Sequence, residues 1–311
     1  MFKIKINDQK PYDVIIGNNI FLEEIEKITK NYSNVVFFVD SNVCVEVNSD
    51  NKIILDLDEN IKNMDTYNDI IINLLNMRIP REKTLFVAIG GGVLLDVIGF
   101  VAATYKRGVD VVYVPTTLLS QVDVAIGSKN GVNVGEFKNM VGTFYNPSLS
   151  IVDTDFLKTL DLRNFNNGMA EVIKYGCIKD KTIIDDLEKD NYDLENIIYK
   201  SLLCKQFFIE SDPFDHGLRQ VLNFGHTYGH AIEGFYNYEK YFHGEAISIG
   251  MNIKFKNNRL KKICEKFNLP TSIEDEVLLE LNNYMKNDKK IGTRDDIFIN
   301  IKDFGQYILG E

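Results

Sequence analysis

The stretch "FVAIGGGVLLDVIGFVAATY", residues 86–105, is the most apolar part of the chain and decides its fold class. Four glycines and Asp96 interrupt it, which is untypical of a membrane span. The pattern instead predicts a buried strand, a tight turn at Gly90, Gly91 and Gly92, and a helix. Backbone N–H groups at such a helix start attract phosphate, although the G-x-G-x-x-G dinucleotide fingerprint is absent. The turn thus predicts either a phosphate site or only a backbone that needs positive φ.

Short apolar strands alternate with helices around this turn. In the first half of the chain we expect helices at 21–30 and 64–77, and strands at 34–40, 52–57, 84–90, 110–115 and 148–153. Near-continuous apolar strands that alternate with helices are typical of a mostly parallel sheet covered on both faces. The sequence therefore predicts an α/β domain over residues 1–153, with a Rossmann-like sheet.

The pattern changes after residue 153. We expect helices at 164–178, 194–210, 219–236, 243–267 and 273–286, followed by one strand at 296–301. This predicts a second, mainly α-helical domain over residues 154–311. A cleft between two unlike domains is a common place for a ligand.

The composition and net charge of the chain indicate which kinds of molecule it can bind. A net charge of −10 over 311 residues argues against a nucleic-acid or anionic-membrane surface, which would need a basic face. The start of the chain lacks the apolar core of a signal peptide, and the four cysteines are scattered without a C-x-x-C pair. We therefore expect a cytoplasmic protein that binds neither nucleic acid nor membrane. A small anionic substrate stays compatible with the charge, because distant charges are screened.

The stretch "RQVLNFGHTYGHAIE", residues 219–233, contains two of the four histidines of the chain. As one helix, it would place four polar side chains on one face: Arg219, Asn223, His226 and His230. A surface stripe would more usually consist of lysine and glutamate, and a single histidine is most often structural. Four such groups on one stripe favour a functional site.

The same stretch offers metal ligands. Histidines four residues apart on a helix can chelate zinc, and a glutamate from a neighbouring helix can complete the set. The motif "MAEVIKYG" offers Glu171, with Lys174 one turn later, and "FHGEA" offers His243 at an expected helix start. The spacing leaves two ligand pairs open, His226 with His230 and His226 with His243.

Several basic residues indicate an anionic substrate. They are Arg107, Lys129, Lys138 beside Asn139, Lys205, Lys289 and Lys290. Most lysines are solvated surface residues, but Lys129 and Lys138 lie in expected glycine-containing loops next to asparagine, where anion cradles form. The segment "PTTLLSQVD" adds threonines and Asp123 where a parallel strand is expected to end, and ligands usually bind there. Together these residues predict a phosphate-bearing substrate.

Six motifs, in this order, resemble the 3-dehydroquinate synthase family of sugar-phosphate cyclases. They are "GGGVLLDVIGFVAATYKRG", "VPTTLLSQVDVAIGSKNGVN", "KNMVGTFYNP", "AEVIKYG", "GLRQVLNFGHTYGHAIE" and "HGEAISIGM". The resemblance covers residues 35–290 and implies an N-terminal NAD-binding domain, a helical metal-binding domain and a substrate cleft between them.

The resemblance also implies a role for each matching residue. A zinc or cobalt ion would be held by Glu171, His226 and His243, and His230 would be an unligated catalytic or substrate-contacting histidine. The implied contacts to substrate hydroxyls and carboxylate are Asp123, Lys129, Lys174, Arg219, Asn223, Lys205 and Lys289 or Lys290. The implied phosphate contacts are Arg107, Lys138, Asn139 and His230. NAD would contact Asp40, Asn42, Glu59, Lys62, Gly90, Gly91, Gly92, Asp96, Thr116, Thr117 and Leu119.

The implied reaction converts 3-deoxy-D-arabino-heptulosonate 7-phosphate into 3-dehydroquinate and phosphate. NAD would oxidise one alcohol transiently, phosphate would leave by β-elimination, the ketone would be reduced again, and an intramolecular aldol would close the ring. Because the cofactor ends unchanged, the implied enzyme is a lyase. The resemblance also suggests a homodimer.

Some positions depart from the family pattern, among them Leu95, Phe137 and "DPFDHG" at 212–217. The last of these leaves open a sister cyclase that makes an inosose or valiolone ring. A metal-dependent polyol dehydrogenase of similar architecture would need no phosphate site, so the basic residues argue against it. A non-catalytic binding homologue would not be expected to retain all three implied metal ligands.

Overall fold

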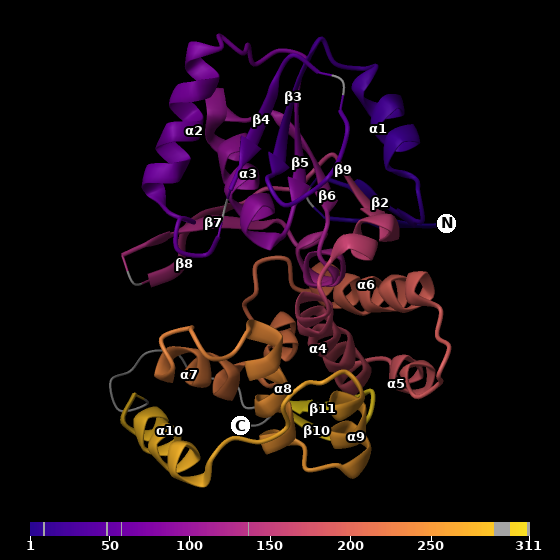
Figure 1. Ribbon diagram of the computed structural model, residues 1–311, viewed down its shortest axis with the longest axis vertical. Helices are drawn as coiled ribbons and strands as arrows, with labels where there is room; N and C mark the ends of the chain where they lie inside the picture. The colour runs from indigo at the N-terminus through magenta and orange to yellow at the C-terminus, as the bar shows by residue number, and fades with distance from the viewer. Residues whose placement is uncertain (9, 48, 57, 136, 289–298, 310–311) are drawn as a thin grey trace. The chain divides into compact units, whose positions relative to one another are not determined.

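The computed structural model describes residues 1–8, 10–47, 49–56, 58–135, 137–288 and 299–309. The chain forms two compact units, Met1–Leu160 (unit 1) and Asp161–Glu311 (unit 2), whose elements are labelled in Figure 1. Each unit has hydrophobic core clusters of its own. The roles expected for the two halves of the chain, NAD binding and metal binding, stay predictions.

A mostly parallel sheet forms the centre of unit 1. In the described part of the chain it has seven strands in the order β1-β2-β9-β6-β5-β3-β4. The strands are β1 (Phe2–Ile6), β2 (Tyr12–Gly17), β3 (Asn34–Asp40), β4 (Lys52–Leu55), β5 (Thr84–Gly90), β6 (Asp110–Pro115) and β9 (Leu149–Asp153). Only β1 and β2, at one edge, pair in antiparallel fashion. The predicted parallel sheet is confirmed, although β1 and β2 were not predicted.

Helices cover both faces of this sheet (Figure 1). They are α1 (Phe21–Thr29), α2 (Met64–Asn76) and α3 (Gly92–Thr104), with the short segments η1 (Tyr105–Arg107), η2 (Ser120–Val124) and η3 (Thr154–Thr159). Phe86 and Ala88 of β5 pack with α2 and α3 in one core cluster. Val87 and Ile89 point to the other face and pack with α1. Because both faces are buried, β5 is a continuous apolar run in the sequence.

A separate antiparallel hairpin belongs to unit 1, formed by β7 (Lys129–Val134) and β8 (Phe137–Phe144). The prediction that Lys129 and Lys138 lie in loops is wrong, because both residues lie on these strands. The strands approach closely at Gly142, where a Cβ would lie 2.0 Å from the carbonyl oxygen of Asn130. The glycines that suggested loops therefore permit close contact between two strands.

Unit 2 is mainly helical, as predicted. Its elements are α4 (Leu162–Ile178), α5 (Lys181–Leu187), α6 (Leu194–Ser211), η4 (Leu218–Asn223), α7 (His226–Phe235), α8 (His243–Lys254), α9 (Asn258–Lys266), α10 (Asp275–Asp288), β10 (Ile299–Asp303) and β11 (Gln306–Leu309). The helices α4, α6 and α10 match predicted helices, whereas α5 and β11 were not predicted. Part of the strand expected at 296–301 lies outside the described residues.

The single helix predicted at 219–236 is wrong, and with it the continuous polar stripe. The chain forms η4 and then breaks at Gly225, whose φ is +82°. A Cβ on Gly225 would lie 2.7 Å from Met251 Cγ, so this glycine lets α7 begin directly against α8. As a result, Arg219 and Asn223 lie on η4, whereas His226 and His230 lie on α7.

The single helix predicted at 243–267 is also wrong. The helix α8 ends before Phe255, which has a non-helical backbone with φ −122° and ψ 85°. The next helix, α9, begins after Asn257, whose side chain accepts hydrogen bonds from the backbone N–H groups of Arg259 and Leu260. Asparagine is among the preferred residues at this capping position, so the break has a local cause in the sequence.

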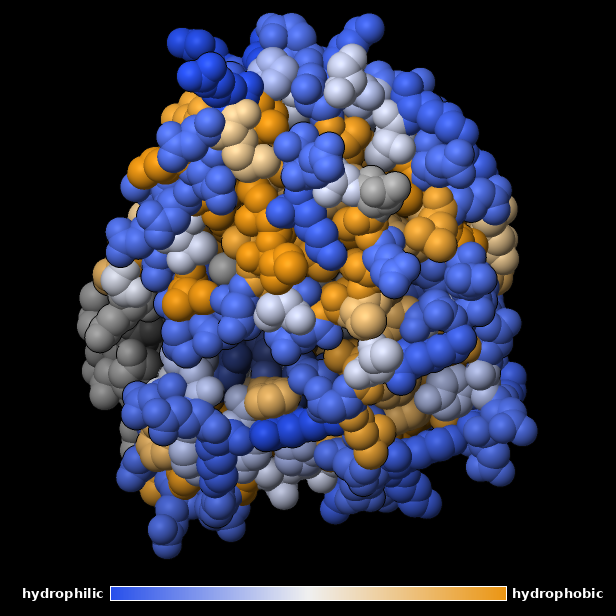
Figure 2. Space-filling model, turned by 45° about the horizontal axis from the view of Figure 1, so that its top comes forward, coloured by the Kyte–Doolittle hydropathy of each residue, from blue (hydrophilic) through white to orange (hydrophobic). Residues whose placement is uncertain are grey.

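No helix in the described residues is both long and apolar enough to cross a bilayer. In Figure 2, hydrophilic side chains surround patches of hydrophobic ones on the face that is shown. Exposed hydrophobic residues of the hairpin include Phe137, Met140 and Phe144.

Candidate metal centre

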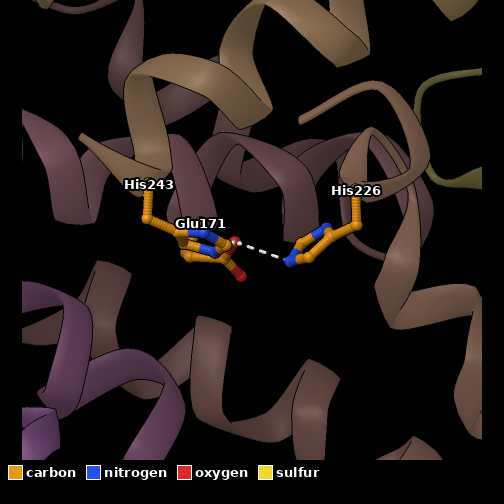
Figure 3. A group of neighbouring side chains, drawn as sticks. All are labelled: Glu171, His226 and His243. Carbon is orange, nitrogen blue, oxygen red and sulfur yellow. Dashed lines mark ion pairs between the residues drawn. The ribbon is translucent and has the colours of Figure 1, made fainter. Parts of the chain in front are cut away.

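Three side chains from three helices of unit 2 converge (Figure 3): Glu171, His226 and His243. Glu171 lies on α4, and the two histidines are the first residues of α7 and α8. The Nε2 atoms of His226 and His243 lie 3.7 Å and 4.0 Å from Glu171 Oε1. One possible ligand atom from each residue lies within 4.8 Å of the other two. The group therefore has the size of a site for one metal ion.

Local contacts fix the start of α8, where His243 lies. The Glu245 carboxylate accepts a hydrogen bond of 2.8 Å from the backbone N–H of Phe242, and it also pairs with Arg163 of α4 at 2.7 Å. The N–H of Gly244 donates a 2.5 Å hydrogen bond to the Asn167 side chain on α4. A Cβ on Gly244 would lie 2.1 Å from the carbonyl oxygen of Asn167. Glycine is therefore required for α8 to approach α4 this closely.

The Glu171 carboxylate is buried, and the protein satisfies only one of its two oxygens. The residue is 1% exposed, and Lys174 makes an ion pair with Oε2. Among the described residues, Oε1 has no hydrogen-bond donor, while Lys174 meets Oε2. Buried polar atoms without partners are rare and costly, so Oε1, which the Nε2 atoms of both histidines face, is an open acceptor. A divalent cation at Oε1 would satisfy it, and one glutamate with two histidines is a common ligand set of zinc with one open position.

The two imidazoles both present Nε2 to Glu171. His226 Nδ1 lies 3.3 Å from the carbonyl oxygen of Phe224, and His243 Nδ1 lies 3.3 Å from Glu233 Oε2. Since each Nδ1 faces an acceptor, it carries the proton in the neutral ring and leaves the Nε2 lone pair available for a metal.

The protonation of the two histidines differs because their neighbours differ. Burial holds the pKa of His226 well below its usual value, and the charge of Lys174 lowers it further, so the ring is neutral, as a ligand must be. Burial also acts to lower the pKa of His243, but the hydrogen bond and charge of Glu233 outweigh it and raise that pKa.

Glu233 was missed in the sequence analysis. It lies on α7, two turns after His226, and is 8% exposed. The seven-residue spacing from His226 was the available signal, because it places both side chains on one face of a helix. His230 lies between them, is exposed, and its ring centre is 5.3 Å from that of His226 and 5.9 Å from that of His243.

The other residues expected to contact substrate in unit 2 lie in different environments. Lys174, Lys205 and Arg219 are buried, whereas Asn223 is exposed. The unusual stretch 212–217 wraps around Arg219: the guanidinium donates a 2.9 Å hydrogen bond to the Pro213 carbonyl, and Asp212 accepts one of 3.1 Å from its backbone N–H. Lys289 and Lys290 lie outside the described residues.

A second group of expected site residues gathers in unit 1. Lys62 donates hydrogen bonds of 2.6 Å to Asp96 and 2.7 Å to Asn139. Lys62 is 3% exposed, and burial raises the pKa of Asp96 against the opposing charge of Lys62. Glu59 Oε1 lies 4.0 Å from Lys138 Nζ. Residues expected to contact NAD and residues expected to contact phosphate therefore touch each other here.

A third set of expected NAD contacts lies where β3, β5 and β6 end. These strands are neighbours in the sheet, and their carboxyl ends are followed by Asp40 and Asn42, by Gly90–Gly92, and by Thr116, Thr117, Leu119 and Asp123. The carboxyl edge of a parallel sheet is the usual place for a ligand. Arg107 precedes β6 and is exposed, so it lies at the opposite end of that strand, away from this set.

The glycine turn does not need a left-handed backbone. Gly91 caps α3 with φ −74°, and none of Gly90, Gly91 and Gly92 has a positive φ, so that explanation of the turn is wrong. A Cβ on Gly90 would press to 3.1 Å from Asp40 Cβ and Leu94. Close packing between neighbouring strand ends and the start of α3 is the reason for glycine at this position.

Comparisons with known proteins identify the family of this chain. Residues 52–167 match the family described as 3-dehydroquinate synthase N-terminal, and residues 168–291 match the family described as 3-dehydroquinate synthase C-terminal. The chain belongs to the 3-dehydroquinate synthase family. It is 40% identical to the 3-dehydroquinate synthase of Clostridium acetobutylicum, over 86% of this chain and 84% of the relative. It is 36% identical to that of Dictyoglomus thermophilum, over 93% and 88%.

Two solved structures share the fold. One is 2-epi-5-epi-valiolone synthase from Streptomyces hygroscopicus subsp. jinggangensis 5008 with NAD+ and Zn2+ bound, with a TM-score of 0.83, 24% identity, and coverage of 99% of this chain and 94% of that one. The other is a 2-deoxy-scyllo-inosose synthase complexed with carbaglucose-6-phosphate, NAD+ and Co2+, with a TM-score of 0.82, 22% identity and the same coverage. The recognised family and fold class are thereby confirmed.

Replacement of Gly244 by alanine should weaken metal binding. The added Cβ pushes α8 away from α4 and so separates His243 from Glu171, and overpacking of this kind costs about 1–3 kcal/mol. We expect the affinity of the apo-protein for Zn2+ to fall at least about 10-fold, the lower limit for changes around metal ligands. Chelator competition measures the affinity. The control is Gly234→Ala on α7, where nothing lies within 4 Å of the added Cβ. Equal affinities in both variants would contradict the role given to Gly244.

Proposed function

We propose that this protein is a 3-dehydroquinate synthase, a lyase that converts 3-deoxy-D-arabino-heptulosonate 7-phosphate into 3-dehydroquinate and phosphate. The observation that carries the proposal is the convergence of Glu171, His226 and His243 in a chain of this family. The reaction comprises transient oxidation of an alcohol, β-elimination of phosphate, reduction of the ketone and an intramolecular aldol. The balance is one heptulosonate phosphate in, one carbocycle and one phosphate out, with no net change in NAD.

Glu171, His226 and His243 are proposed to hold Zn2+ or Co2+ through one carboxylate oxygen and two Nε2 atoms. The bound ion supplies a Lewis acid that polarises substrate hydroxyls and stabilises negative charge on oxygen. Lys174 supports the proposal as a buried cation beside Glu171, able to donate a hydrogen bond to a substrate oxygen. His230, exposed and one turn from His226, is proposed to exchange a proton with substrate.

NAD is proposed to bind to unit 1, where it supplies a reversible hydride acceptor. The proposed contacts are Asp40, Asn42, Glu59, Lys62, Gly90, Gly91, Gly92, Asp96, Thr116, Thr117 and Leu119. Most of these residues follow the carboxyl ends of β3, β5 and β6 or belong to the group around Lys62, and this supports their assignment.

The substrate is a small anion, a carboxylate and a phosphate joined by hydroxylated carbons. Its proposed contacts are Asp123, Lys129, Lys138, Asn139, Arg107, Lys174, Lys205, Arg219, Asn223 and His230. We further propose that the enzyme works in the cytoplasm as a homodimer and uses neither nucleic acid nor membrane. The net charge of −10 supports the last point.

The decisive experiment is incubation of the metal- and NAD-loaded protein with the heptulosonate phosphate. We expect inorganic phosphate to appear with substrate turnover while absorbance at the NADH wavelength shows no net rise, because the hydride is returned in each cycle. Hexose and heptulose phosphates that lack the carboxylate are the matched controls, and they should react at least about 100-fold more slowly, because the buried cations that bind the carboxylate are left unpaired. Stoichiometric accumulation of NADH would instead identify a dehydrogenase and end the proposal.

The two histidines of α7 should respond differently to alanine. His226→Ala removes a proposed ligand, so we expect metal affinity to fall by more than about 100-fold. This exceeds the loss that is typical when only a hydrogen-bond partner of a ligand is removed. His230→Ala should keep its metal and lose about 100- to 10,000-fold in kcat, as expected for loss of a proton-transferring group. Metal content by atomic emission and steady-state kinetics measure the two effects. Equal metal content in both variants, or full activity in metal-stripped wild type, would contradict these assignments.

A further inference from the structure

The imidazole of His243 lies between two buried carboxylates, one at each ring nitrogen. Nε2 is 4.0 Å from Glu171 Oε1, and Nδ1 is 3.3 Å from Glu233 Oε2. Glu233 comes from α7, and Glu171 comes from α4. The side chains of the two glutamates are 2% and 9% exposed, so neither is a solvated surface charge. Three helices therefore define the orientation of one ring.

A neutral imidazole carries its single proton on either nitrogen, and only the other nitrogen can bind a metal. A carboxylate at Nδ1 accepts the N–H hydrogen bond, so it selects the tautomer whose Nε2 lone pair points at Glu171. It also makes the imidazole a stronger electron donor to the ion. Without Glu233, the ring could rotate about its side-chain bonds. It could also carry its proton on Nε2, and that tautomer cannot bind a metal through Nε2.

His226 shows the same arrangement with a different acceptor. Its Nδ1 lies 3.3 Å from the backbone carbonyl of Phe224. A backbone carbonyl therefore accepts the Nδ1 hydrogen bond of His226, whereas a side-chain carboxylate accepts that of His243. Of the two outer contacts, only the one from Glu233 can be removed by a substitution that leaves the backbone unchanged.

Glu233 could alternatively be a ligand, because His230, Glu233 and His243 also form a group with candidate atoms within 4.8 Å. An ion in that group would have to use Nδ1 of His243 while the first ion uses Nε2. A neutral imidazole offers a lone pair on one nitrogen at a time, so the two ions would compete for His243. The hydrogen-bonding role leaves His243 in its ordinary neutral form.

We infer that Glu233 is a positioning residue that orients His243 as a metal ligand through the Nδ1 hydrogen bond. The inference rests on the proposed metal site and adds to it a residue that does not itself touch the ion. It gives the centre two carboxylates of different function, one that binds the metal and one that binds a ligand of the metal.

The test is Co2+ titration of metal-free protein, with wild type compared with Glu233→Ala, Glu233→Gln and Glu239→Gln. The visible absorption of bound Co2+ reports ligand geometry, chelator competition gives the affinity, and a circular dichroism melt checks folding. We expect Glu233→Ala to bind Co2+ about 10- to 100-fold more weakly and with a changed spectrum. Glu233→Gln keeps a carbonyl oxygen that accepts the N–H, so it should recover part of the affinity and a spectrum close to wild type. Glu239 is exposed on the chain just after α7, so Glu239→Gln removes the same charge and should match wild type.

Each other outcome has a definite meaning. Folded Glu233→Ala with wild-type affinity and spectrum overturns the inference and leaves the metal site intact. Two equivalents of Co2+ in wild type and one in Glu233→Ala would make Glu233 a ligand and overturn it as well. Wild type that binds no Co2+ would reject the proposed function itself. If Glu233→Ala does not fold, Glu233→Gln decides: an affinity as low as that of a variant without His243, such as His243→Ala, overturns the inference.

Discussion

The charge of one buried carboxylate organises unit 2. Glu171 is almost fully enclosed, and an ionised carboxylate in such a place is destabilising unless positive groups surround it. Lys174, one turn later on α4, supplies one positive charge, but its ammonium does not complete the hydrogen bonding of the two oxygens. The imidazoles of α7 and α8 face the same carboxylate with unprotonated nitrogens. Glu171 Oε1 and the two Nε2 atoms are acceptors that lie close together, an arrangement that a cation among them would stabilise.

Glycine contacts hold the three helices close enough for this set to form. Zinc–ligand bonds are about 2 Å long, so helices that share an ion must pack with little side-chain volume between them. A Cβ on Gly250 of α8 would lie 2.1 Å from the carbonyl oxygen of Gly225, and a Cβ on Gly229 of α7 would lie 2.5 Å from Ile247. Together with Gly244 against α4, these positions make α8 the helix around which the centre is built. The three side chains can therefore converge only because glycines let the backbones of these helices approach so closely.

The sequence predicts what depends on local patterns and misses what depends on tertiary approach. Strand β5 and helix α3 follow from one apolar run, and Glu171 and His243 follow from short motifs. The choice between His230 and His243 as partner of His226 could not be made from spacing, because both histidines lie near His226 and only the packing of α8 on α4 brings His243 to Glu171. Helical spacing across 219–236 wrongly predicted one polar face, because periodicity does not reveal that Gly225 has a positive φ and interrupts the helix. A role for Glu233 can be inferred only once the structure shows that its carboxylate lies beside His243.

Both histidines lie at helix starts, where a nearby carboxylate is electrostatically favourable. The N-terminus of a helix carries a partial positive charge, which disfavours a protonated imidazole and also repels a cation. His226 and His243 begin α7 and α8, and Lys174 adds a full positive charge to the same region. Glu171 alone would set one negative charge against these groups and a bound divalent ion. The buried Glu233 carboxylate, whose Oε2 lies 3.3 Å from His243 Nδ1, adds a second negative charge to this region without facing the Nε2 atom.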